Sequence, residues 1–206
     1  MSALRSLALR CAALLLALGC QAAGAQEYSE AAVKAAFLYR FTQYVEWPPA
    51  ALAAHAFTID VLGADEVGRE LEHFLPGRLI HGVPATVRRI RDLRELGEAQ
   101  VLYIGPGRDA ASVIAALPQR SVLVVTDDEA RGLDAGGTVN FVVIDRRVRF
   151  EISLAAAERA GLRVSSELLG VAQRVQGVPR RSDTRCSDPP AIGDPALRCG
   201  TFVALR

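Results

Sequence analysis

Residues 101–126 read VLYIGPGRDAASVIAALPQRSVLVVT, and they indicate a strand, a helix and a second strand in that order. The two strand segments, residues 101–104 and 121–126, are short and largely apolar, as parallel strands covered on both faces are. The helix between them, residues 109–117, supplies the crossover that parallel neighbours require. This unit predicts an α/β fold with a mostly parallel sheet flanked by helices.

The alternation of helices and strands continues toward the N-terminus. Apolar side chains recur at helical spacing through residues 29–46, Ser29 is a suitable N-cap, and Trp47-Pro48-Pro49 ends the helix. Residues 83–90 begin with alternating polar and apolar side chains, which indicates a strand with one solvated face. The elements expected in this part are helices over residues 29–46 and 65–74, a helical turn or two over residues 92–96, and strands over residues 57–62 and 83–90.

The pattern changes after residue 137. Strands are expected over residues 138–144 and 148–152, and the connection between them is only Asp145-Arg146-Arg147. So short a connection requires an antiparallel hairpin. Helices are expected over residues 154–160 and 165–175. The predicted fold is therefore a mostly parallel sheet with a C-terminal antiparallel hairpin.

The first 25 residues have the features of a secretory signal. Arg5 and Arg10 give a positive start, residues 11–18 are apolar, and Ala23-Gly24-Ala25 is a small-x-small cleavage site. Cleavage after Ala25 predicts an exported, periplasmic protein. Acylation of Cys20, which would make the protein a lipoprotein, is the alternative.

The mature chain divides into an α/β domain, residues 26–177, and a proline-rich irregular tail, residues 178–206. The tail holds both cysteines of the mature chain, Cys186 and Cys199. In an oxidising compartment we expect them to pair. Such a bond stabilises a small domain by about 3 kcal/mol. A metal site is the weaker interpretation, because the three histidines of the chain lie far back in the sequence.

Charge and motifs argue against several classes of function. The formal net charge is +1 and the arginines are scattered among acids, so no nucleic-acid surface is expected. Gly105 to Ala110 match G-x-G-x-x-A, but Pro106 removes an N–H that a bound phosphate needs, and a tight strand-to-helix turn explains the glycines. Asp127-Asp128-Glu129 is either a cation site or a solvated loop. We expect no cofactor and no catalytic activity, since no recognisable catalytic constellation is present.

Two residues of the first helix are candidates for partner contact. Tyr39 points away from the apolar stripe formed by Phe37, Phe41 and Tyr44, and aromatic side chains are enriched at interfaces. Arg40 falls inside that stripe. Either its guanidinium extends to water or pairs with an acidic side chain, or it is available to bind a partner. We expect Tyr39 and Arg40 to contact a partner protein.

Two blocks of sequence resemble the YfiR family of periplasmic regulators. The first is VKAAFLY at residues 33–39, continuing to VEWP at residues 45–48. The second is GGTVNF at residues 136–141 and RVRFEI at residues 147–152, followed by AAERAGL and SSELL. The resemblance covers about residues 28–177. Trp47, Phe141, Phe150 and Leu169 are expected core residues.

The resemblance implies a non-enzymatic homodimer that binds the periplasmic part of an inner-membrane diguanylate cyclase and represses it, which lowers cyclic di-GMP. It also implies that an OmpA-like outer-membrane lipoprotein can take the repressor away. The chain departs from the family in four respects: no cysteine within residues 28–177, Arg40 and Ser153 where asparagine is common, and the tail. A periplasmic small-ligand sensor, using strand ends near residues 105–109 and 126–129, is the alternative.

Overall fold

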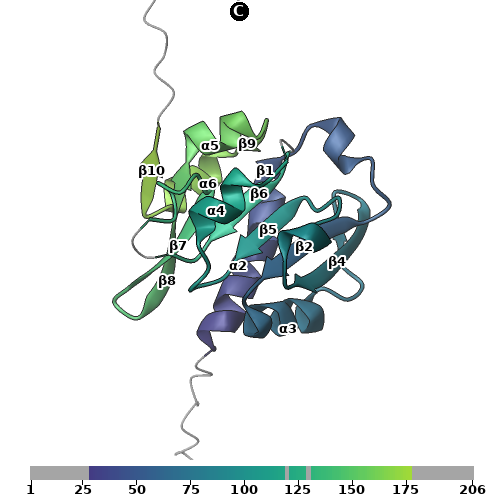
Figure 1. Cartoon of the computed structure of the whole chain (residues 1–206), viewed down its shortest axis with the longest axis horizontal. Helices are drawn as coiled ribbons and strands as arrows, with labels where there is room; N and C mark the ends of the chain where they lie inside the picture. Colours follow the sequence, from purple (N-terminus) through teal and green to yellow (C-terminus); the bar gives the residue numbers. More distant parts are fainter. Residues whose placement is uncertain (1–27, 119–120, 129–130, 178–206) are drawn as a thin grey trace, which may run out of the picture.

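The computed structural model describes residues 28–118, 121–128 and 131–177 and contains one eight-stranded sheet (Figure 1). Its strand order is β10-β8-β7-β6-β5-β2-β4-β3. The strands are β2 Phe57–Leu62, β3 Leu79–Ile80, β4 Val83–Ile90, β5 Val101–Ile104, β6 Leu123–Thr126, β7 Val139–Ile144, β8 Arg147–Ser153 and β10 Arg174–Gln176. Strands β4, β2, β5, β6 and β7 are mutually parallel, which confirms the predicted mostly parallel sheet.

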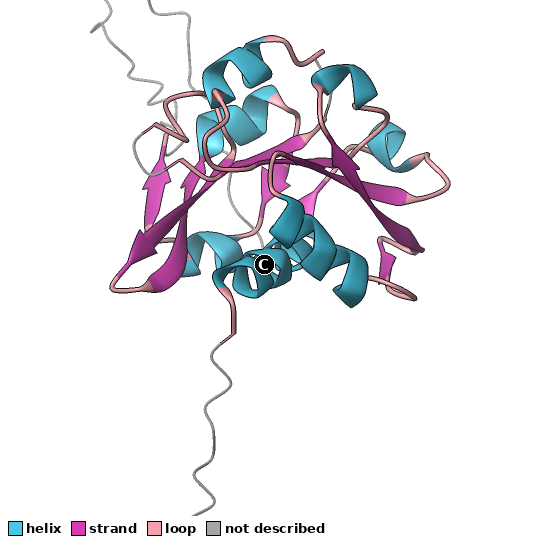
Figure 2. Cartoon of the chain, turned by 60° about the horizontal axis from the view of Figure 1, so that its bottom comes forward, coloured by secondary structure: helices cyan, strands magenta, loops and turns pink. Residues whose placement is uncertain are grey.

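Helices cover both faces of this curved sheet (Figure 2). Helices α2, Glu30–Tyr44, and α3, Asp65–Phe74, pack together on one face, and α4, Ala110–Ala115, packs on the other. Shorter elements complete the fold: α5 Leu154–Arg159, α6 Ser166–Val171, and the 3₁₀ turns Pro49–Leu52 and Leu93–Glu95. The short strands β1, Val45–Glu46, and β9, Arg163–Val164, form a separate antiparallel pair.

The larger core lies between α2 and the sheet. Phe37 and Phe41 of α2 pack against Phe141 and Phe150, with ring centroids 5.0–6.1 Å apart. Trp47, Phe141 and Phe150 are buried and Leu169 is partly buried against the same core, so these predicted core residues are confirmed. Ser29 caps α2 as predicted, because its hydroxyl accepts a bond from the N–H of Ala32 at 3.1 Å.

The predicted C-terminal hairpin is present. Strands β7 and β8 pair antiparallel from Val139 opposite Ile152 to Ile144 opposite Arg147. Its turn has two residues rather than three, Asp145 and Arg146, and both have left-handed φ values, 51° and 58°. Two consecutive residues with left-handed φ values are typical of the two-residue hairpin turn, whose twist matches that of the flanking strands.

The predicted helix over residues 165–175 is wrong beyond Val171. Helix α6 ends there, and Arg174–Gln176 form β10, which pairs parallel with β8. The apolar spacing of these residues is helical, but their backbone forms hydrogen bonds with β8 instead. The N–H of Gln173, for example, donates to the carbonyl of Phe150 at 2.8 Å. The Arg174 guanidinium also binds the Glu151 carboxylate at 2.9 Å.

The predicted signal at residues 1–25 and the Cys186–Cys199 bond lie outside the described residues. Within the part of the chain that the structure describes, no helix has the length and apolar character that crossing a bilayer requires.

Candidate functional site

The amino end of α2 lies at the carboxyl edge of the parallel strands. Leu62, Ile104 and Thr126 are the last residues of β2, β5 and β6, and the pairing register places them level with one another. The strand order reverses between β2 and β5, since the chain builds outward to β4 and then returns to β5. Ligand sites of open α/β sheets gather at such a point.

A buried lysine occupies this edge. Lys34 of α2 is 5% exposed, and its ammonium donates to Oδ2 of Asp127 at 2.6 Å and to the carboxylate of Glu30. The hydroxyl of Tyr103, a fully buried residue of β5, donates to the same Asp127 oxygen at 2.7 Å. One carboxylate oxygen therefore joins α2 to the carboxyl ends of β5 and β6.

These contacts change the acidity of both donors. Burial alone lowers the pKa of Lys34, but the hydrogen bonds and charges of Asp127 and Glu30 outweigh it, so that the pKa lies above its ordinary value. Burial, together with the Asp127 carboxylate, raises the pKa of the Tyr103 hydroxyl well above its ordinary range. Lys34 is therefore a fixed cation and Tyr103 a fixed hydrogen-bond donor at neutral pH.

Two hollows flank this cluster. One, of about 340 Å³, lies at the reversal of strand order and is lined by Gly63, Tyr103, Lys34 and the start of α3. The other, of about 620 Å³, lies between the turn after β5 and Val143 of β7, with Lys34 and Asp127 in its wall. Both volumes fall in the range of small-ligand sites.

The loop after β6 is held by an amide and a hydroxyl. The hydroxyl of Thr126 donates to Oδ1 of Asn140 at 2.9 Å, and the N–H of Asp128 donates to the same oxygen at 3.2 Å. The Asn140 amide donates to the carbonyl of Asp128 at 3.0 Å. A Cβ at Gly132 would lie 1.9 Å from this Oδ1, so the closing loop requires glycine there. This network fixes the residues next to Asp127.

The glycine turn after β5 serves packing. A Cβ at Gly105 would lie 2.6 Å from the carbonyl oxygen of Gly63, so the glycine lets the loops after β2 and β5 meet. Asp109 caps the six-residue helix α4 through the N–H of Ser112. These contacts agree with the tight strand-to-helix turn rather than with a dinucleotide site. No group of three or more metal-binding side chains occurs among the described residues.

Tyr39 and Arg40 lie on α2 but face different surroundings. Tyr39 is partly buried, with its ring edge-on to Phe74 of α3 at 5.3 Å and beneath the Arg78 guanidinium at 5.1 Å. Arg40 is exposed, with its guanidinium 5.8 Å from the centre of the Tyr44 ring, so it reaches water. Their contact with a partner remains a prediction.

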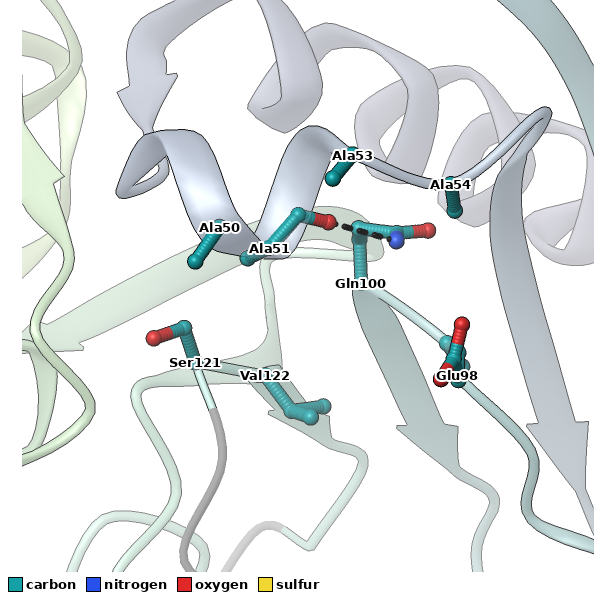
Figure 3. Close-up of a pocket in the computed structure, with 9 residues that line it drawn as sticks. Ala50, Ala51, Ala53, Ala54, Glu98, Gln100, Ser121 and Val122 are labelled. Carbon is teal, nitrogen blue, oxygen red and sulfur yellow. Dashed lines mark hydrogen bonds between the residues drawn. The ribbon is translucent and has the colours of Figure 1, made fainter.

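A further hollow, of about 470 Å³, lies at the amino edge of the parallel strands, between the Pro49–Leu52 turn and the starts of β5 and β6 (Figure 3). Gln100, only 4% exposed, lies beneath this turn: its amide donates to the carbonyl of Ala51 at 2.8 Å and accepts from the N–H of Thr58 at 2.7 Å. Its backbone carbonyl accepts from the Trp47 indole at 3.2 Å. Gln100 thus ties the segment after α2 to the sheet, which is a structural role.

The strand ends predicted for a ligand site, residues 105–109 and 126–129, lie beside one another as far as residue 128, and residue 129 lies outside the described residues. Lys34 and Tyr103 were not predicted as site residues. Lys34 is the only lysine in an arginine-rich chain and precedes the buried Leu38 by one helical turn. Tyr103 is the only polar-tipped residue of its strand. The sequence shows both features, but their role in the site follows only from the packing of α2 over the ends of β5 and β6.

Residues 31–173 match the family model described as YfiR/HmsC-like. A comparison with curated proteins finds no match. A conserved domain protein from Vibrio cholerae O1 biovar El Tor is 11% identical, with a TM-score of 0.47 over 72% of this chain and 60% of that one. The ABC domain in complex with L-Trp from Streptococcus pneumoniae is 11% identical, with a TM-score of 0.42 over 58% of this chain and 55% of that one. The chain spans less than two thirds of either structure.

Proposed function

The chain belongs to the YfiR/HmsC-like family, and we propose that it binds the periplasmic part of an inner-membrane diguanylate cyclase and represses it. Members of this family are periplasmic regulators rather than enzymes. The family match over residues 31–173 carries the proposal, because it spans nearly the whole described domain. The folded domain acts as a homodimer, and an OmpA-like lipoprotein relieves the repression by competing for it.

Repression of this kind is a shift of population. The chain binds the inactive conformation of the cyclase more tightly than the active one, and the difference in binding free energy sets how far the equilibrium moves. A tenfold preference corresponds to about 1.4 kcal/mol. This mechanism needs no chemical step on the cyclase.

Calorimetry tests the proposal directly. The mature protein, residues 26–206, is titrated with the periplasmic domain of the cyclase encoded nearest its own gene. We expect a dissociation constant in the micromolar range or tighter. Absence of heat, when both proteins are folded, contradicts the proposal.

Variants of α2 test the predicted contact. Tyr39→Ala with Arg40→Glu is expected to weaken binding, and Arg91→Glu, at an exposed arginine of the loop after β4, is the control. Tyr39 also packs on Phe74. The double variant is therefore compared with Phe74→Ala, which loses that packing and keeps both candidate contact residues. Equal affinity of wild type and double variant overturns the contact.

A small-ligand sensor is the second candidate. The observation that favours it is the pair of hollows beside Lys34, one of which lies at the point where the strand order reverses. A ligand that binds only the folded chain raises its melting temperature, by an amount set by concentration over dissociation constant. A thermal-shift screen is the test, with Lys34→Met as control, since a ligand at this site loses its effect in that variant.

A further inference from the structure

A groove of about 700 Å³ separates the start of α2 from the β7–β8 hairpin. Tyr28, Val33 and Phe37 line it on one side, and Val143 and Val148 line it on the other. Tyr28 is 72% exposed and Val143 is 39% exposed. Figure 1 shows the hairpin projecting at the same end of the molecule as the start of α2. Apolar surface in a concave setting is typical of a binding surface.

The topology explains why the hairpin is uncovered. Strand β6 pairs with β7 only as far as Asn140, which is opposite Thr126. The remainder of β7, from Phe141 to Ile144, has only β8 as its neighbour in the sheet. Val143 and the 38%-exposed Ile144 therefore extend past the carboxyl edge of the sheet.

The groove carries an excess of positive charge. Three of its lining residues are the exposed arginines Arg146, Arg147 and Arg149, and none of them forms an ion pair within the described part of the chain. Glu30 is the one acidic lining residue, and its carboxylate is bound to Lys34. Guanidinium groups without an intramolecular partner are available to carboxylates, which they often bind through two hydrogen bonds.

We propose that this groove docks a segment of a partner protein in which an apolar side chain is flanked by aspartate or glutamate residues. Charge complementarity selects this occupant. The chain's own tail, residues 178–206, has five arginines and three aspartates, so its charge has the same sign as that of the groove. The site is also hollowed, which suits an inserted segment better than a flat lipid surface. The identity of the partner rests on the proposed function, and this inference adds which surface of the chain the partner binds.

The affinities of two probes are measured for wild type and for two variants. One probe is the periplasmic domain of the cyclase. The other is a pair of synthetic peptides that have leucine and phenylalanine among glutamates, or among lysines in the same places. The groove variant is Arg146→Glu with Arg147→Glu. The control is Arg91→Glu with Arg159→Glu, which makes the same change of net charge at exposed arginines elsewhere.

We expect the acidic peptide to bind wild type more tightly than the basic peptide does, and the groove variant to lose about tenfold in affinity for the acidic peptide and the cyclase domain. The control variant stays within about twofold, and added salt weakens the wild-type complex. Val143→Asp, which leaves the arginines in place, gives a second loss of similar size. Fluorescence of the single tryptophan, Trp47, verifies that each variant is folded.

The outcomes separate the two claims. Equal affinities of the groove and control variants for a cyclase domain that does bind overturn the groove and leave the proposed function standing. Groove-dependent binding of the acidic peptide without binding of the cyclase domain supports the groove and overturns the cyclase as partner. Two outcomes overturn a partner protein as the occupant of the groove. One is that wild type binds phosphatidylglycerol vesicles but not the acidic peptide. The other is that the groove variant loses a dimer that wild type forms, while neither protein binds the peptide.

Discussion

Replacement of Lys34 by methionine tests the buried cluster at the carboxyl edge. Methionine keeps an unbranched apolar side chain that is one atom shorter than that of lysine, and it removes the ammonium. The Asp127 side chain, 9% exposed, then keeps only the hydroxyl of Tyr103 as the partner of Oδ2. Removal of one member of a buried pair leaves a buried charge without compensation.

The size of the effect follows from the two contacts of Lys34. Loss of one partner of a buried pair costs about 3–5 kcal/mol. The contact with Glu30 adds little, because that side chain is 56% exposed and pairs of this spacing on a helix contribute about 0.3–0.5 kcal/mol. Since Tyr103 continues to bind Asp127, we expect a loss of about 3 kcal/mol in the free energy of unfolding, the lower end of that range.

Urea unfolding of residues 26–206, followed by the fluorescence of Trp47, measures this loss. With a denaturant slope of about 2 kcal/mol per molar, the midpoint falls by about 1.5 M. Glu30→Gln is the matched control and should lose about 0.5 kcal/mol or less. In the double variant with Asp127→Asn the two losses should not add, since the stranded charge is gone. A loss in Lys34→Met no larger than in Glu30→Gln refutes the reasoning.

The same residue gives a pH dependence. The pKa of Lys34 in the folded chain lies above its ordinary value of 10.5, so the folded chain holds this proton more tightly than the unfolded chain does. The stabilisation is complete below pH 10.5 and is lost as the pH rises through the folded pKa. We expect wild type and Lys34→Met to approach one another in stability above that pH.

Three other changes test the remaining contacts. Gly132→Ala places a methyl group 1.9 Å from Oδ1 of Asn140 and should lower the unfolding free energy by at least about 2 kcal/mol in urea unfolding; a neutral result contradicts the packing of this loop. Gln100→Ala removes two side-chain bonds at the amino edge and should cost about 2 kcal/mol, with the Trp47 emission wavelength nearly unchanged because its indole binds the backbone. Burial raises the pKa of the Asp60 carboxyl in the folded chain, despite its pairing with Arg88. The contribution of Asp60 to the unfolding free energy therefore falls as the pH rises from 3.8 through the folded pKa. Asp60→Asn should remove this part of the pH dependence of stability, and an unchanged pH dependence contradicts the reasoning.

Local sequence pattern is enough to predict several elements of this fold. The strands over residues 57–62, 83–90 and 101–104 and the helix over residues 65–74 have the bounds that were expected. Each is delimited by glycine, proline or a clear change of period, so local chemistry suffices. The helix over residues 165–175 failed because β8 offers residues 174–176 a ladder of hydrogen bonds that no local pattern reveals.

The site depended on relations that a sequence does not contain. Lys34 looks like an ordinary helix residue until α2 lies over the ends of β5 and β6, where Asp127 and Tyr103 meet it. Tyr39 shows the converse. Helical spacing placed it on the polar side, yet α3 folds against that side and partly covers it. Packing between elements decided both cases.

Cyclic di-GMP in living cells tests repression most directly. Its concentration is compared in the parent strain, in a strain lacking this protein, and in one that also carries an inactive active-site variant of the cyclase. The account predicts a rise when the protein is removed and a return to the parent level when the cyclase is also inactive. An unchanged concentration in the first strain, or a rise that persists without cyclase activity, contradicts repression of this cyclase.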